Sequence, residues 1–123
     1  MDGWIGVDLD GTLAEYHGWQ GVDHIGDPIP AMVSRVKEWI KEGKSVRIFT
    51  ARAFAPEDDR DRQHEAHRAV KVIQDWCLKH IGTVLPVTCT KDYGMLCLWD
   101  DRAVQVIPNA GITISELYGA FNK

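Results

Sequence analysis

The sequence predicts an α/β protein with a mainly parallel sheet that is covered by helices on both faces. Short apolar runs such as residues 4–9 and 45–50 are typical of buried parallel strands. They alternate with longer segments whose apolar residues recur at helical spacing, as in residues 31–43 and 67–82. No linker, repeat or low-complexity segment interrupts this pattern, so we expect a single domain over residues 1–123.

The elements are expected in the order strand, helix, strand, helix, strand, strand, strand and helix. Residues 14–27 are rich in glycine and aromatic residues without a period, which predicts a flap after the first strand. Pro28 and Pro30 precede the first helix, and Gly43 ends it. Residues 52–63 are polar and are predicted to form a loop before the second helix. The remaining expected elements are strands over residues 84–90, 95–101 and 103–108 and a helix over residues 113–122, with Thr113 or Ser115 as its N-cap.

Composition limits the partners and the compartment. The formal net charge of −4 and the absence of a basic stripe argue against nucleic acid as the main partner. No apolar run approaches the roughly 20 residues of a membrane span, and no signal peptide precedes the acidic end of the first strand. Three cysteines without metal-binding spacing are expected to be reduced thiols that serve as small core residues, which predicts a cytoplasmic protein.

Polar residues follow several strands at the point where each strand ends. Asp8 and Asp10 follow the first strand, Thr50 ends the second, and Asp100 and Asp101 end the strand expected at 95–101. Ligands of open α/β sheets bind outside the carboxyl ends of the strands. The sequence therefore predicts a site at this edge, although Asp8 and Asp10 alone would also suit an ordinary solvated turn.

The residue types at this edge favour phosphate chemistry. Clustered carboxylates need a cation, and oxygen ligands on loops suit Mg²⁺, which bridges carboxylate and phosphoryl oxygens. Thr50 offers a hydroxyl and Lys91 a positive charge to a phosphate group. Of Asp8 and Asp10, one carboxylate can attack phosphorus and the other can transfer the proton.

Four short stretches carry a resemblance to a known family. They are "DLDGT" at Asp8–Thr12, "IFTAR" around Thr50, Lys91, and "LCLWDDRA" around Asp100 and Asp101. In this order they resemble motifs I to IV of the haloacid-dehalogenase-like (HAD) superfamily of phosphohydrolases. The resemblance implies a Rossmann-like three-layer α/β/α sandwich with a five-stranded sheet of order 3-2-1-4-5.

The resemblance also implies roles for the acidic residues. Asp8 would be the nucleophile that forms an aspartyl-phosphate, with a metal-binding oxygen. Asp10 would be the general acid and base, with its backbone carbonyl on Mg²⁺. Asp100 would bind Mg²⁺, and Asp101 would bind it through water or orient Lys91. The second aspartate of motif I points to a phosphatase, a phosphoric monoester hydrolase, rather than to a dehalogenase.

The remaining site residues are expected to contact the substrate. The resemblance makes Thr50 and Lys91 catalytic residues that hold the phosphoryl group, and Gly11 and Thr12 line it. Arg52 follows Thr50 closely and would either bind substrate or pair with the acidic residues at 57–61.

The chain lacks the large cap domain of most HAD relatives, because only residues 14–27 follow motif I before the first helix. The expected partner is a small phosphorylated substrate, and either a larger substrate or a neighbouring subunit of a homo-oligomer would complete the open site. Aromatic residues of the flap, such as Tyr16 and Trp19, would either stack on a substrate or cover the loop. The alternatives are a non-catalytic HAD-like protein that binds phosphate or metal, and a phosphomutase.

Overall fold

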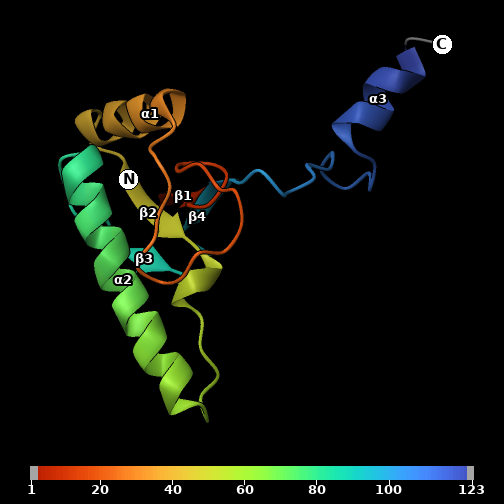
Figure 1. Cartoon of the computed structure of the whole chain (residues 1–123). Helices are drawn as coiled ribbons and strands as arrows, with labels where there is room; N and C mark the ends of the chain where they lie inside the picture. Colours follow the sequence, from red (N-terminus) through yellow and green to blue (C-terminus); the bar gives the residue numbers. More distant parts are fainter. Residues whose placement is uncertain (1–2, 122–123) are drawn as a thin grey trace.

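The computed structural model describes residues 3–121 and confirms an α/β fold with a parallel sheet (Figure 1). Within these residues four strands lie in the order β3-β2-β1-β4, and every neighbouring pair is parallel. The elements are β1 (Trp4–Asp8), α1 (Pro30–Lys41), β2 (Ser45–Phe49), the 3-10 helix η1 (Ala51–Ala53), α2 (Arg60–His80), β3 (Val87–Thr88), β4 (Met95–Trp99) and α3 (Ile114–Phe121). None of these helices is long and apolar enough to cross a bilayer.

The hydrophobic core lies between one face of the sheet and the helices α1 and α2. Ile5 and Val7 of β1 and Ile48 of β2 are buried in this core. The helices contribute Val33 and Val36 of α1 and Ile73 and Cys77 of α2. Because successive strand residues point to opposite faces, Trp4 and Gly6 lie on the other face. Both helices therefore cover the same face of the sheet, as two successive right-handed crossovers in one direction require. The helix layer predicted for the second face is not formed within residues 3–121, because α3 stands clear of the sheet.

The three cysteines are free thiols, but the expectation that they are core residues holds for Cys77 alone, since Cys89 is half-buried and Cys97 is exposed. Cys77 lies in the core, and burial raises the pKa of its thiol to about 12. Such a thiol stays protonated at neutral pH and serves as a small apolar residue.

The predicted bounds of one loop and one strand need correction. The polar residues 52–63 do not all form a loop, because α2 begins at Arg60, and the Asp59 carboxylate caps it by accepting the Arg62 N–H at 3.0 Å. The strand expected over residues 84–90 is limited to Val87–Thr88.

The strand expected over residues 103–108 is not formed in the described chain. Only residues 100–102 separate it from β4, and a parallel neighbour needs a crossover of about a dozen residues. Instead, Val106 bridges Thr113 in an antiparallel pair, and the Ile107 N–H donates to the Ile112 carbonyl at 2.8 Å. The sheet thus has one strand fewer than the predicted order 3-2-1-4-5.

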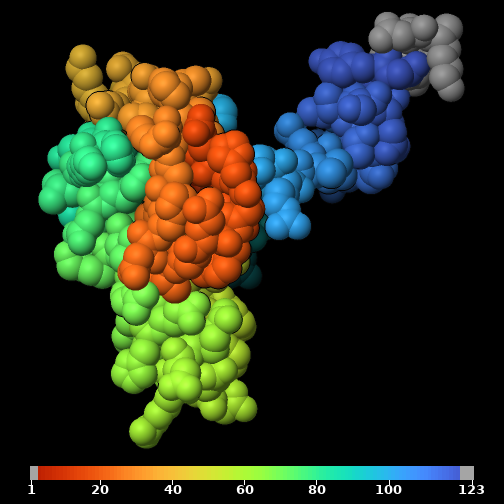
Figure 2. Space-filling model, in the orientation of Figure 1, coloured from red at the N-terminus to blue at the C-terminus, as the bar shows by residue number. Residues whose placement is uncertain are grey.

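The C-terminal helix forms as expected, and the Thr113 hydroxyl caps it by accepting the Glu116 N–H at 3.0 Å. Asn122, the last residue predicted for this helix, lies outside the described residues. Figures 1 and 2 show residues 103–121 standing clear of the body.

The flap over residues 14–27 contains no helix or strand, in agreement with the prediction. Hydrogen bonds nonetheless hold the flap in place. The Glu15 N–H donates to the Asp27 carbonyl at 2.8 Å and closes its two ends, and the Trp76 indole of α2 donates to the Gly26 carbonyl at 3.1 Å. Val22 is buried and anchors the middle of the flap.

Candidate active site

Three carboxylates meet where β1 and β4 end side by side. Asp8 is the last residue of β1, and Asp100 and Asp101 directly follow β4. One oxygen atom from each of the three lies within 4.8 Å of the others. Hard oxygen donors at this spacing fit a divalent cation such as Mg²⁺, which is the ion that the sequence predicts.

Thr12 joins the two motifs that supply these carboxylates. Its hydroxyl lies 3.2 Å from Asp8 Oδ2 and 3.3 Å from Asp101 Oδ1, and it accepts the Asp101 N–H at 3.0 Å. The turn before it depends on Gly11, which has a φ of 89°. A Cβ at Gly11 would collide with the Asp101 carboxylate, only 2.8 Å from its Cγ. The glycine thus allows the close approach of the two loops.

The carboxylate cluster disfavours the charge of Asp8. Burial is the largest cause that raises the pKa of Asp8 to about 7, followed by its hydrogen bond with Asp101 and the negative charge of Asp100. The hydrogen bond from Thr12 acts in the opposite direction. A divalent cation would relieve this repulsion, so the electrostatics of the cluster also fit a metal site.

We expect the metal-free protein to lose stability as the pH rises from about 4 to about 7. The pKa of Asp8 rises from its ordinary 3.8 to about 7 on folding, so in this window the folded chain holds a proton that the unfolded chain releases. Raising the pH therefore favours unfolding of the wild type. Asp8→Asn has no titrating carboxyl at this position, so its stability lacks this pH dependence.

Thermal melts of both proteins with a chelator across this window measure the effect. The Tm of the wild type should fall relative to that of the variant, and excess Mg²⁺ should reverse the fall. A difference in Tm that is constant with pH would contradict the expectation.

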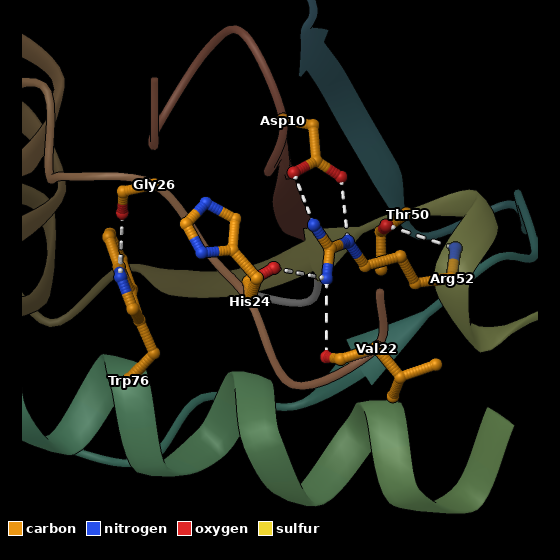
Figure 3. A network of polar contacts seen from close by, with 7 residues as sticks. All are labelled: Asp10, Val22, His24, Gly26, Thr50, Arg52 and Trp76. Carbon is orange, nitrogen blue, oxygen red and sulfur yellow. Dashed lines mark hydrogen bonds and ion pairs between the residues drawn. The ribbon is translucent and has the colours of Figure 1, made fainter. Parts of the chain in front are cut away.

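Arg52 pairs with Asp10 through two parallel hydrogen bonds (Figure 3). Its Nε and Nη2 atoms each lie 2.8 Å from a carboxylate oxygen of Asp10. The two side chains are only 7% and 21% exposed. The sequence suggested a pair with the acidic residues at 57–61, and the structure gives Arg52 this different partner instead. The Asp10 side chain therefore faces Arg52 and is not part of the three-carboxylate group.

The same guanidinium holds the flap. Arg52 Nη1 donates to the carbonyls of His24 at 3.0 Å and Val22 at 3.5 Å. Its Cζ lies 4.9 Å from the ring centroid of Trp19. The Thr50 hydroxyl accepts the Arg52 N–H at 3.2 Å and fixes the start of η1. One arginine thus links the end of β2, the flap and Asp10.

A cavity of about 540 Å³ opens beside these groups. The predicted site residues on its wall are Asp8, Asp10, Thr50, Arg52, Asp100 and Asp101. Thr50 is buried, and Tyr16 and Trp19 of the flap form part of the wall while remaining well exposed. The flap aromatics are therefore in reach of a bound molecule, although Trp19 also covers Arg52.

Lys91 is not brought to this site. It is exposed, and it is not among the residues that line the cavity. The next residue, Asp92, accepts a hydrogen bond at 2.8 Å from the indole of Trp4, which is the first residue of β1. Asp8 lies at the other end of that strand, roughly 13 Å away at the usual rise per strand residue.

Two arginines that were not predicted as site residues also line the cavity. Arg62 comes from the first turn of α2, and Arg102 directly follows Asp101. Arg102 could have been suspected from its adjacency to the acidic pair. Arg62 could not, because its nearness depends on α2 beginning earlier than predicted.

No family model matches the chain, and no curated protein matches it either. Its structure is similar to that of a conserved protein from Bacteroides thetaiotaomicron, with a TM-score of 0.51 and 20% sequence identity. The match covers 97% of this chain and 88% of the other. At this identity the likeness shows the α/β fold alone, and function has to be argued from the site.

Proposed function

We propose that the protein is a Mg²⁺-dependent phosphatase of the HAD type that hydrolyses a small phosphomonoester. The observation that carries the proposal is the convergence of Asp8, Asp100 and Asp101, with one oxygen of each within 4.8 Å of the others at the mouth of a cavity. Thr50 lies on the same cavity wall and supplies a hydroxyl for a phosphoryl oxygen. Acidic oxygen donors beside such a hydroxyl suit a metal-bridged phosphate.

In the proposed reaction an oxygen of Asp8 attacks phosphorus, and the bond from phosphorus to the leaving oxygen breaks. Asp10 protonates the leaving oxygen and later takes a proton from the water that hydrolyses the aspartyl-phosphate and releases inorganic phosphate. Asp8, Asp100 and Asp101 would hold Mg²⁺, which would supply positive charge that offsets the repulsion between the attacking carboxylate and the phosphate. Both Asp10 oxygens accept bonds from Arg52, so each proton transfer requires one of these bonds to be exchanged for the leaving oxygen or water.

The resemblance gave Lys91 the role of binding the phosphoryl group, and another cation has to take that role. Lys91 lies off the cavity wall, whereas Arg52, Arg62 and Arg102 lie on it. We propose that Arg102 takes this role, because it adjoins Asp101 and its N–H donates to Asp100 at 2.8 Å. A guanidinium suits phosphoryl oxygens through its planar donors.

The alternative is a non-catalytic HAD-like protein that binds phosphate or metal. Two observations favour it, the position of Lys91 and the occupation of both Asp10 oxygens by Arg52. This alternative keeps the metal site and removes turnover, so the two proposals differ in a measurable way.

We expect release of inorganic phosphate from an aryl phosphate and from at least one small phosphomonoester when Mg²⁺ is present. A chelator should abolish the release, and added Mg²⁺ should restore it. Calorimetric titration with Mg²⁺ provides the comparison. Metal binding without turnover of any ester would support the non-catalytic alternative, and neither binding nor turnover would contradict both.

The cysteines and the net charge suggest the compartment and the partners of the proposed enzyme. The free thiols of Cys77, Cys89 and Cys97 suit a reducing compartment, so we propose a cytoplasmic enzyme. With a net charge of −4, we propose small anionic substrates held by metal and arginine, and no nucleic-acid or membrane partner.

A further inference from the structure

Residues 103–121, called the arm here, have the composition of a buried segment. Across these residues the only charged side chain is Glu116, whereas 26% of the whole chain is charged. Yet the arm stands clear of the body (Figures 1 and 2), and Val104, Val106 and Tyr118 are exposed. An eight-residue helix such as α3 is marginal in water without a surface to pack on. We therefore expect the arm to pack against an apolar surface.

The sheet offers a surface of the matching kind. The face opposite α1 and α2 carries no helix within residues 3–121, and the half-buried Met95 and Leu98 of β4 lie there beside Gly6. In the same residues no strand pairs with the outer edge of β4. An open strand edge accepts an added strand, and an apolar sheet face accepts a helix.

The arm cannot easily reach this surface on its own chain. Residues 100–102 are too few for a crossover that would place residues 103–107 parallel to β4. A tight antiparallel reversal would disturb this loop, in which Asp101 is bonded to Thr12 and the Arg102 N–H to Asp100. The direction in which the arm leaves the body points to a surface on another molecule.

We propose that the arm of one copy docks on the β4 edge and the helix-free sheet face of a second copy, and that the exchange is reciprocal. The arm's strand-forming residues 103–107 supply the fifth strand, and α3 covers the open face. The result is a closed two-fold dimer, because each copy has one arm and one acceptor surface. This inference does not depend on the proposed phosphatase activity.

Analytical ultracentrifugation of the full chain at micromolar concentrations tests the association. The wild type should sediment as a dimer. Val104→Asp should raise the dimer Kd by at least about tenfold, because it buries an unpaired charge at the interface. Val104 is 72% exposed within its own copy, so the variant should stay folded, and its circular dichroism spectrum should lose no more than the contribution of the eight-residue α3. Val84→Asp is the matched control, since Val84 is 50% exposed outside the arm and should leave the dimer intact.

Cross-linking between copies tests where the arm docks. Cys97 on β4 is exposed, and the probe is a short bis-maleimide. A tagged Cys97→Ser, Val106→Cys copy is mixed with an untagged wild type, and the heterodimer is expected to cross-link. A tagged Cys97→Ser copy without the new cysteine is the control. The Val106→Cys variant that keeps Cys97 tests docking within one chain. The proposal would be overturned by a wild type that is monomeric at all concentrations, or by a cross-link that forms within single chains of this variant and not between copies.

Discussion

Asp8→Asn is expected to lower kcat for an aryl phosphate by at least about a thousandfold, the scale seen when a catalytic nucleophile is removed. The amide cannot attack phosphorus to form the covalent intermediate, and it contributes no negative charge to the metal site. Its size and shape match those of the carboxylate. Since the pKa of Asp8 is raised to about 7, the folded chain already tolerates an uncharged group at this position. The variant is therefore expected to fold.

The measurement is phosphate release at saturating Mg²⁺, with Tm recorded for each protein. Asp75→Asn is the control, because Asp75 pairs with Lys71 on the exposed side of α2, far from the cavity wall. It should retain wild-type kcat. If Asp8→Asn kept activity within about tenfold of the wild type, Asp8 could not be the nucleophile.

Much of this site could be predicted from the sequence, because strand ends are local features. The apolar run before Asp8 defines β1, and the run before Asp100 defines β4. Adjacent parallel strands bring their carboxyl ends together whatever the loops do. The place of Thr50 after β2 therefore follows from a short segment. The meeting of Asp8 with Asp100 and Asp101 also needs β1 and β4 to be neighbours, which only the family resemblance implied.

Positions that depend on loop paths could not be predicted in the same way. Lys91 lies between β3 and β4, and nothing local shows that its neighbour Asp92 bonds to Trp4 at the far end of β1. Arg52 had several acidic residues within reach in sequence, and its choice of Asp10 depends on how η1 turns after β2.

The missing fifth strand has a different cause. Residues 103–108 have a strand-like pattern, and pattern alone does not reveal which chain supplies the neighbouring strand. Connection length was the overlooked signal, since residues 100–102 are too few for a parallel return.

Arg52→Met is expected to destabilise the fold by about 3 kcal/mol, because it leaves the charge of the mostly buried Asp10 side chain without its partner. It also removes the bonds to the His24 and Val22 carbonyls and the stacking partner of Trp19, so the flap loses its tie to the site. For a chain of this length the Tm should fall by roughly 10 °C. The Tm of Arg52→Lys should lie between those of the wild type and Arg52→Met, because lysine keeps the positive charge but cannot form the bidentate pair with Asp10.

A double-mutant cycle separates the loss of the ion pair from the loss of packing. Asp10→Asn combined with Arg52→Met leaves no unpaired charge, so it should be less destabilised than the sum of the single variants by about 2 kcal/mol. Arg68→Met is the matched control, since it breaks the other arginine–aspartate pair of the flap, with Asp23 at 2.8 Å. Both of those side chains are well exposed, so the loss should be below about 1 kcal/mol. Equal losses for Arg52→Met and Arg68→Met in urea denaturation would show that the Asp10–Arg52 pair does not hold the flap in place.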